Sequence, residues 1–243
     1  MKILVAIIAY NEAKSIGGVI DDLIEHNIGY DIIVVNNGSF DQTKIVCESK
    51  KIKTLSHCVN SDINGTWKTY LNYAYRNNYD IVCQFDGDGQ HLAKELHKIL
   101  EPIQSKEANQ VIGSRFLGTN TFRSSFIRRI GIRLFSYILS SIFKYTIKDI
   151  TSGFIAFDRR VISFFATYYK SEINDSNQTH LLSFFSGAKI KEVPVEMNIR
   201  SHGTSLFNWL NSFVYPFNGL FNIVGCLLLK KEIIKDWTNN YES

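Results

Sequence analysis

The chain has 243 residues, of which 45% are hydrophobic and 21% are charged, and its formal net charge is +4. This composition supports a folded core and excludes an intrinsically disordered chain. A charge this small gives no reason to expect a nucleic-acid partner, and none is predicted. The length suits one large domain, or one domain with a short appendage.

The first half of the chain alternates short apolar runs with amphipathic segments. Strands are predicted at 3–9, 31–35, 53–55, 81–85 and from 111, and helices at 14–25, 41–49, 67–76 and 93–104. Near-continuous apolar strands separated by helices are typical of a parallel sheet that is covered on both faces. The prediction is therefore an α/β fold with a Rossmann-like, doubly wound, mostly parallel sheet.

The second half is more apolar and locally basic. A helix is predicted over 124–144, and further strands at 152–157 and 190–195. The helix carries Arg128, Arg129 and Arg133 among apolar residues, and the aromatic stretch 205–231 ends in two lysines. Two interpretations stay open for the helix, packing on the sheet or a peripheral contact with a membrane interface, and the apolar and basic stretch 220–231 could lie in the same interface. We expect one domain over 1–205 and a C-terminal helical, apolar appendage over 206–243, without a membrane-spanning run of about 20 residues.

Cysteine usage and the N-terminus indicate the compartment. The cysteines show no paired spacing of the kind found in zinc sites or redox dithiols, and we expect Cys47 and Cys83 to pack in the core. The apolar run 3–9 is followed by Tyr10-Asn11-Glu12 and lacks a signal-peptide cleavage site, so a buried first strand is predicted. The expected location is the cytoplasm, with a peripheral position on the inner face of the cell membrane as a further expectation.

Polar segments follow three of the predicted strands. They are Tyr10-Asn11-Glu12, Asn36-Asn37-Gly38-Ser39 and Asp86-Gly87-Asp88. Ligands of open α/β sheets bind at the carboxyl ends of the strands, so these segments are predicted to meet in one site.

The segment Asp86-Gly87-Asp88 has the composition of a divalent-metal site. Two carboxylates close together repel one another unless a cation joins them, and the glycine permits a sharp turn and close approach of a ligand. Mg²⁺ or Mn²⁺ would take oxygen ligands here and bridge to a diphosphate, with Gln90 as a neutral oxygen ligand. The alternative is a polar turn with exposed aspartates.

Seven segments, in this order, resemble glycosyltransferase family 2, and most closely its dolichyl- and polyprenyl-phosphate sugar transferase branch. The resemblance implies the GT-A fold, an inverting transfer and a nucleoside-diphosphate sugar donor. The segments are Ile8 to Glu12, Val34 to Ser39, Gln84 to His91, Ile112 to Phe116, Asp149 to Phe154, Glu192 to Val195 and Arg200 to Ser205.

The resemblance also implies roles at the matching positions. The nucleotide-sugar would be bound by Ala9, Tyr10, Glu12, Asn36, Asn37, Asp86, Gly87 and Arg200. The metal would be held by Asp86, Asp88 and Gln90. The acceptor would be bound by Arg115, Arg129 and Ser152. Asp149 would be the catalytic base, or would position the acceptor if the acceptor is a phosphate, which needs no base.

Two segments depart from the family pattern. Asn36-Asn37 replaces the usual pair of aspartates, which keeps an acceptor oxygen but loses the charge and adds a donor. The change would alter nucleotide preference, weaken binding or abolish activity. The turn expected before the third helix, 64–69, contains Trp67 in place of a glycine- and lysine-rich sequence, and we expect Trp67 to pack in the core.

The leading hypothesis is a metal-dependent inverting glycosyltransferase of cell-surface glycan synthesis, with a lipid-linked or polysaccharide acceptor. One alternative within this class is a polyprenyl-phosphate sugar transferase. An alternative of another class is a catalytically silent nucleotide-sugar-binding protein. Asn36-Asn37 favours it, and the retained Asp86, Asp88, Asp149 and Arg200 oppose it. A nucleotidyltransferase would need a glycine-rich basic loop after the first strand, and residues 9–12 are not such a loop.

Overall fold

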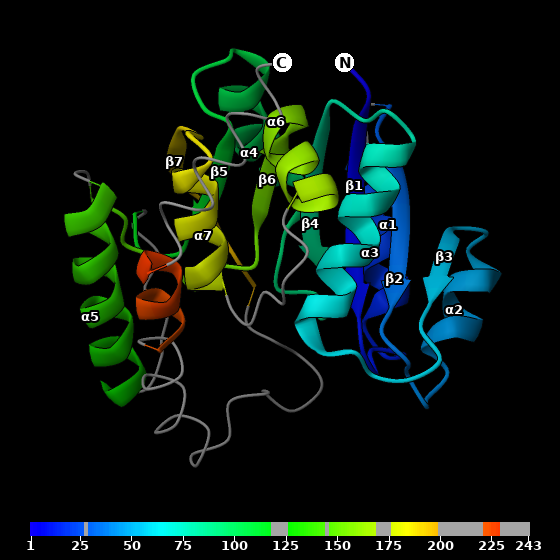
Figure 1. Cartoon of the computed structure of the whole chain (residues 1–243). Coiled ribbons are helices and arrows are strands. Elements are labelled where there is room, and N and C mark those ends of the chain that lie inside the picture. The colour runs from blue at the N-terminus through cyan, green and yellow to red at the C-terminus, as the bar shows by residue number, and fades with distance from the viewer. Residues whose placement is uncertain (27–28, 118–125, 144–145, 169–175, 199–220, 229–243) are drawn as a thin grey trace.

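One mixed sheet forms the centre of the protein (Figure 1). The structure, a computed structural model, describes residues 1–26, 29–117, 126–143, 146–168, 176–198 and 221–228. Within these residues the strands lie in the order β3-β2-β1-β4-β6-β5-β7. Their bounds are β1 Ile3–Ala9, β2 Asp31–Asn36, β3 Lys53–Ser56, β4 Ile81–Asp86, β5 Gln110–Ser114, β6 Ile155–Asp158 and β7 Ile190–Pro194.

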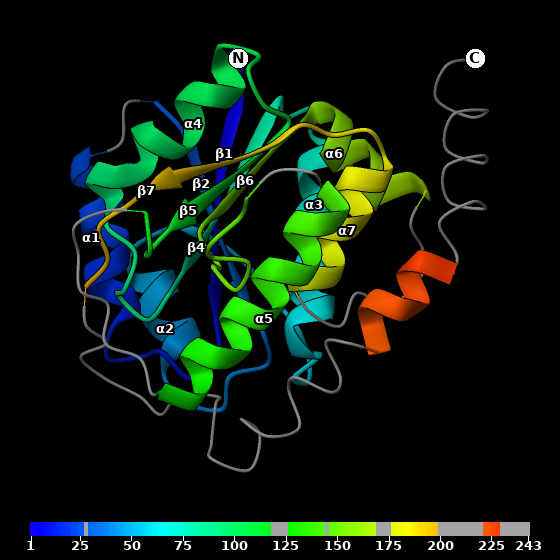
Figure 2. The same ribbon diagram turned by 90° about the vertical axis from the view of Figure 1, so that its left-hand side faces the viewer.

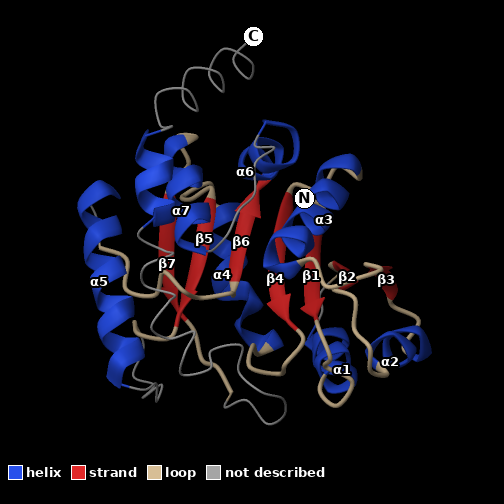
Figure 3. Cartoon of the chain, turned by 60° about the horizontal axis from the view of Figure 1, so that its bottom comes forward, coloured by secondary structure: helices blue, strands red, loops and turns tan. Residues whose placement is uncertain are grey.

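Helices cover both faces of this sheet (Figures 2 and 3). One face packs against α1, α2 and α4, and the opposite face packs against α3, α6 and α7, with α5 beside α7. The α-helix bounds are α1 Ile16–His26, α2 Thr43–Ser49, α3 Asp62–Arg76, α4 Leu96–Gln104, α5 Phe126–Phe143, α6 Arg159–Ser163 and α7 Ser176–Phe185. A short 3₁₀ turn, Ala93–Glu95, precedes α4, and a π-helical turn, Phe164–Tyr168, follows α6.

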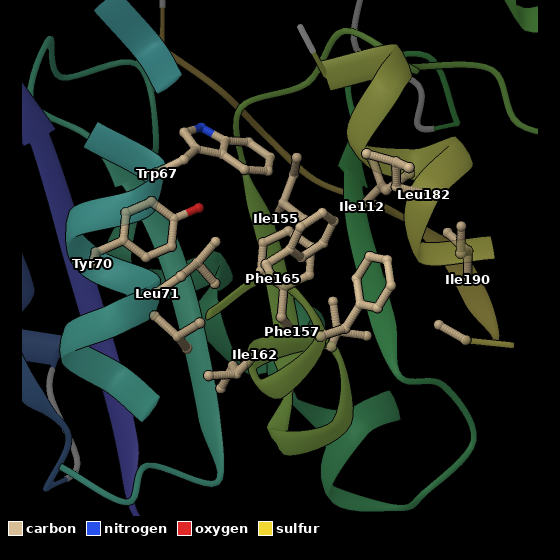
Figure 4. Close-up of a cluster of buried hydrophobic side chains, with 14 of the residues drawn as sticks. Trp67, Tyr70, Leu71, Ile112, Ile155, Phe157, Ile162, Phe165, Leu182 and Ile190 are labelled. Carbon is tan, nitrogen blue, oxygen red and sulfur yellow. The ribbon is translucent and has the colours of Figure 1, made fainter. Parts of the chain in front are cut away.

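Burial on both faces explains the continuous apolar sequence of β1. Alternate side chains of a strand point to opposite faces, so Leu4 joins the cluster under α3 and Val5 joins the cluster under α1. Figure 4 shows the first cluster, in which Trp67 and Tyr70 of α3 pack toward Phe157 of β6. The predicted α/β class is confirmed, and Trp67, 3% exposed, packs in the core as expected.

The strand β6 runs against its neighbours. It pairs antiparallel with β4 and with β5, whereas the other strand pairs of the sheet are parallel. The sequence predicted a strand from residue 152, but the ladder begins at Ile155, and residues 149–153 form a turn before it. The predicted, mostly parallel sheet is thus correct with β6 as the exception.

The helix α3 begins five residues earlier than predicted, at Asp62 instead of Trp67. The prediction of a turn over 64–69 was wrong, since residues 62–76 form one helix whose first N–H group finds a side-chain acceptor. Asn60 Oδ1 accepts the Asp62 N–H at 2.9 Å, and the Thr66 hydroxyl donates to the Asp62 carbonyl at 2.9 Å.

The C-terminal part of the chain adds a helical segment over residues 221–228, which contributes Ile223 and Cys226 to the core cluster. No helix among the described residues is long and apolar enough to cross a membrane. The predicted boundary at 205 lies outside the described residues. Cys47 and Cys83 are buried in the core, as predicted.

Candidate active site

The three polar loops meet at the carboxyl ends of β1, β2 and β4. Backbone hydrogen bonds join them, since Asn37 N–H donates to the Ala9 carbonyl and Gly87 N–H donates to the Ile8 carbonyl, both at 2.9 Å. The Ser15 hydroxyl, at the start of α1, donates to the Gly87 carbonyl at 2.8 Å. The structure therefore brings together the loops that the sequence assigned to one site.

The acidic turn follows β4 directly and is tightly packed against β1. A Cβ on Gly87 would lie 3.0 Å from the Ile8 carbonyl oxygen, and Gly89 adopts a φ of 79°, so both positions favour glycine. Asp88 is buried, and its Oδ1 accepts the Gln90 N–H at 3.0 Å. The side chain of Asp86 is 29% exposed. One carboxylate is thus held in the turn while the other reaches the surface.

His91 orients the carboxylate of Asp86. Its Nδ1 accepts the Asp86 N–H at 3.0 Å, and its Nε2 lies 3.5 Å from Asp86 Oδ2. The ring stacks on Phe154 with centroids 4.6 Å apart. Burial lowers the pKa of His91 to about 4, so the ring is neutral and its proton is on Nε2, facing the carboxylate.

Asp86 is also held from inside the core, by residues to which the sequence analysis assigned no role. Gln84 Nε2 donates to Asp86 Oδ1 at 3.4 Å, and the Tyr70 hydroxyl donates to Gln84 Oε1 at 3.1 Å. Both Gln84 and Tyr70 are buried. A glutamine inside an apolar strand was the available signal, because a buried amide needs hydrogen-bond partners.

Gly153 packs directly against the same carboxylate. A Cβ at this position would lie 2.9 Å from Asp86 Oδ2 and 3.3 Å from Gln84 Nε2. The turn that contains Asp149, Ser152 and Gly153 therefore reaches the acidic turn. Ser152 itself is buried, and its hydroxyl oxygen accepts the Phe154 N–H at 3.2 Å.

Gly153→Ala is expected to lower Mn²⁺ affinity by about tenfold with little change in melting temperature. The added methyl group would displace the end of a side chain, which moves at low cost, but that side chain is the proposed metal ligand. Calorimetric titration of Mn²⁺ in the presence of a nucleoside diphosphate measures the effect. Gly18→Ala, where a Cβ meets no atom within 4 Å, is the control. Unchanged affinity in Gly153→Ala would contradict the placement of Asp86.

Arg115 and Asp149 form a buried ion pair beside this turn. Asp149 Oδ2 accepts the Arg115 N–H at 2.9 Å and Nε–H at 2.7 Å, while Oδ1 accepts an Nη2–H at 2.7 Å. Nη2 also donates to the Thr151 hydroxyl at 2.9 Å. Asp149 is fully buried. In this geometry both of its carboxylate oxygens hold the guanidinium, which fixes where Arg115 lies.

The turn 149–153 is anchored by two further side chains. Glu192 of β7 accepts the Asp149 N–H at 2.6 Å. His180 of α7 donates from Nε2 to the Ile150 carbonyl at 3.1 Å, because its Nδ1 accepts from Gln110 Nε2 at 2.6 Å. Burial lowers the pKa of His180 to about 4, which keeps the ring neutral. Neither His180 nor Gln110 was predicted.

The remaining predicted site residues are placed as follows. Those predicted to bind the nucleotide lie at the ends of β1 and β2 and line the junction of the loops: Ala9, Tyr10, Glu12, Asn36 and Asn37. Arg129 lies in α5, and nothing is described of its side chain. Arg200 lies outside the described residues.

The oxygen ligands of the acidic turn fit a hard divalent cation. Asp86 and Asp88 supply carboxylate oxygens at one sheet edge, and Mg²⁺ and Mn²⁺ prefer oxygen ligands. Over the part of the chain that the structure describes, no three His, Cys, Asp or Glu side chains cluster as a metal site. A protein set of two carboxylates leaves coordination positions for phosphate oxygens and water, as is usual for Mg²⁺ beside a diphosphate.

Comparison with known proteins agrees with this geometry. Residues 4–165 match the sequence profile of glycosyl transferase family 2, and the chain belongs to this family. The protein is a glycosyltransferase with a GT-A fold.

Two curated relatives and one solved structure resemble the chain over most of its length. A UDP-N-acetylglucosamine–dolichyl-phosphate N-acetylglucosaminyltransferase of Methanococcus voltae is 28% identical over 77% of this chain and 82% of its own. A polyprenol monophosphomannose synthase of Mycolicibacterium smegmatis is 23% identical over 86% and 82%. Glucosyl-3-phosphoglycerate synthase of Mycobacterium tuberculosis, solved with Mn²⁺, UDP and phosphoglyceric acid, superposes with a TM-score of 0.69 at 16% identity, covering 92% of this chain and 78% of that one.

Proposed function

We propose that the protein transfers a sugar from a nucleoside-diphosphate sugar to the phosphate of a polyprenyl-type lipid. The observation that carries this proposal is the Arg115–Asp149 pair beside the acidic turn. A guanidinium suits phosphate geometry, and Asp149 fixes its orientation. The names of the relatives from Methanococcus voltae and Mycolicibacterium smegmatis support an acceptor of this class.

The engagement of Asp149 favours a phosphate acceptor over a hydroxyl acceptor. A hydroxyl nucleophile needs a proton acceptor, whereas a phosphate oxygen at neutral pH already carries the charge. The acceptor oxygen forms a bond to the anomeric carbon while the bond from that carbon to the diphosphate breaks, and the electron pair leaves on the diphosphate. A single displacement of this kind inverts the anomeric configuration. No proton has to move to Asp149, which acts by holding Arg115.

The acidic turn binds the donor diphosphate. Asp86, Asp88 and Gln90 are the residues that would hold Mg²⁺ or Mn²⁺, and the ion would supply charge neutralisation for the leaving diphosphate. The Mn²⁺ and UDP in the structure of the glucosyl-3-phosphoglycerate synthase support a metal and a nucleotide of this kind. The loops after β1 and β2 bind the base and ribose, and the family resemblance assigns binding of the diphosphate to Arg200.

A transfer assay tests the proposal. The protein is incubated with Mn²⁺, a panel of labelled UDP- and GDP-sugars, and a short polyprenyl phosphate, and the label that enters the organic phase is counted. The expected result is lipid-linked label with the phosphate and none with the matched polyprenyl alcohol. Equal transfer to the alcohol, or transfer to soluble glycans alone, would contradict the phosphate acceptor.

A peripheral contact with the cytoplasmic face of a membrane accompanies this acceptor. In the helical segment 221–228, Ile223 and Cys226 enter the core, while Phe221 and Leu228 are 80% and 79% exposed on the outer side. In α5, Tyr137 and Arg133 are also exposed. Exposed aromatic and aliphatic groups beside a basic residue suit an interface with anionic lipid.

Phe221→Asp with Leu228→Asp is expected to reduce sedimentation with vesicles containing anionic lipid by at least about fivefold, because two apolar contacts with the interface are lost. The matched control is Phe40→Asp, which changes an equally exposed aromatic residue on the loop between β2 and α2. Equal binding of the double variant and the wild type would remove this surface from consideration.

A further inference from the structure

The side-chain amide of Asn37 is fully used by the segment 57–62. Its Nδ2 donates to Asn60 Oδ1 at 3.0 Å and to the Asp62 carbonyl at 3.1 Å. Its Oδ1 accepts the Ser61 N–H at 3.0 Å, and His57 Nδ1 lies 2.9 Å away. A primary amide has two donors and one acceptor oxygen, so these partners occupy both donors and the oxygen.

The neighbouring Asn36 is engaged differently. Its Oδ1 accepts the Ser39 N–H at 3.2 Å, and its Nδ2 donates to the Ser56 hydroxyl at 3.3 Å. A carboxylate in this place would keep both interactions, because a hydroxyl group can donate as well as accept. At position 37 a carboxylate would instead place an oxygen against two acceptors, Asn60 Oδ1 and the Asp62 carbonyl. The surroundings therefore require an amide at 37 and tolerate either group at 36.

The backbone shows that the segment 57–62 is built onto the end of β2. The His57 N–H donates to the Asn36 carbonyl at 2.9 Å. Gly38 has a φ of 70°, and a Cβ there would lie 2.4 Å from the Val59 carbonyl carbon. The segment also leads into α3 through Ser61 and Asp62. Asn37 is thus the side chain that joins β2, this segment and the start of α3.

We infer that the two asparagines have separate tasks. Asn37 is a positioning residue that fixes the segment 57–62, and Asn36 is the residue that sets nucleotide preference. This inference rests on the proposed nucleotide site. Asn36 pairs in register with Ala9, between the loops that receive the base and ribose, and is buried there. A carboxylate only accepts, whereas an amide also donates, so exchange at 36 changes which base edges are matched. Exchange at 37 changes the shape of the segment 57–62, which affects the binding of every nucleotide alike.

Two isosteric variants, Asn36→Asp and Asn37→Asp, test the inference. The melting temperature is measured without ligand, and dissociation constants are then measured for UDP, GDP, CDP and ADP with Mn²⁺. We expect Asn36→Asp to melt within about 2 °C of the wild type and to change the ratio between two nucleotides by at least fivefold, roughly the value of one hydrogen bond. We expect Asn37→Asp to melt about 4 to 8 °C lower, from the loss of two donor bonds. It should weaken all nucleotides by a common factor.

Each other result counts against the inference. An unchanged melting temperature in Asn37→Asp, or a changed nucleotide order in that variant, overturns the positioning role. An unchanged order in Asn36→Asp overturns the specificity role. If Asn37→Asp does not fold, Asn60→Ala replaces it, with faster hydrogen exchange expected at the Ser61 amide and unchanged exchange as the contrary result. Absence of any nucleotide binding by the wild type would defeat the proposed function, whereas the ligand-free melting temperatures would still test Asn37.

Discussion

Asp88→Asn is expected to abolish the Mn²⁺-dependent stabilisation of the protein by a nucleoside diphosphate and to lower sugar transfer by at least about 100-fold. The variant keeps the size of the side chain and an oxygen that can accept the Gln90 N–H, so the turn itself is preserved. It removes the negative charge that a divalent cation requires. The measurement is the shift in melting temperature on adding UDP or GDP, with and without Mn²⁺.

The matched control is Asp21→Asn, which removes an exposed carboxylate that pairs with Lys50 on the surface of α1. This variant should retain the full metal-dependent shift, because surface ion pairs contribute little and the residue lies away from the sheet edge. A wild-type shift in Asp88→Asn would show that the acidic turn does not hold the metal.

Asp149→Asn is expected to lower the free energy of unfolding by about 3–5 kcal/mol, because it leaves the Arg115 guanidinium buried beside a neutral group. For a chain of this size the melting temperature falls by about 10 °C or more. Transfer should fall as well, since the guanidinium is no longer fixed. Denaturant unfolding and the assay with polyprenyl phosphate measure the two effects.

A double variant distinguishes the loss of the ion pair from the cost of burying one unpaired charge. Arg115→Met with Asp149→Leu replaces both charges by apolar groups and should recover much of the lost stability, although it should remain inactive. Glu107→Gln, which breaks an exposed ion pair with Lys191, should leave the melting temperature unchanged. If Asp149→Asn were as stable as the wild type but inactive only toward hydroxyl acceptors, Asp149 would be a proton acceptor instead of the partner of Arg115.

The sequence predicted the elements whose side chains repeat with a clear period. The strand over 3–9 and its helix were recognisable because β1 is buried on both faces and α1 on one, and the polar loops followed directly from where the strands end. The family motifs then assigned roles to Asp86, Asp88 and Arg115.

Other features depended on contacts between distant segments and were not predictable. The start of α3 at Asp62 depends on Asn37 and Asn60, and the sequence does not show that these side chains meet. The pairing of Asp149 with Arg115 spans 34 residues. The sequence therefore does not distinguish a catalytic base at Asp149 from a buried carboxylate that holds an arginine. Gln84 and His180 were missed because a single polar residue in an apolar segment does not reveal its partner.

The direction of β6 determines which parts of the chain can contribute to catalysis. A strand parallel to β4 places only the residues that follow it at this edge of the sheet. An antiparallel strand places the residues that precede it there. Because Gln84 pairs with Ile155, the register places Gly153 opposite Asp86. A one-residue insertion or deletion between Gly153 and Ile155 would shift the Arg115 anchor relative to the acidic turn. We therefore expect this short connection not to tolerate a change in its length.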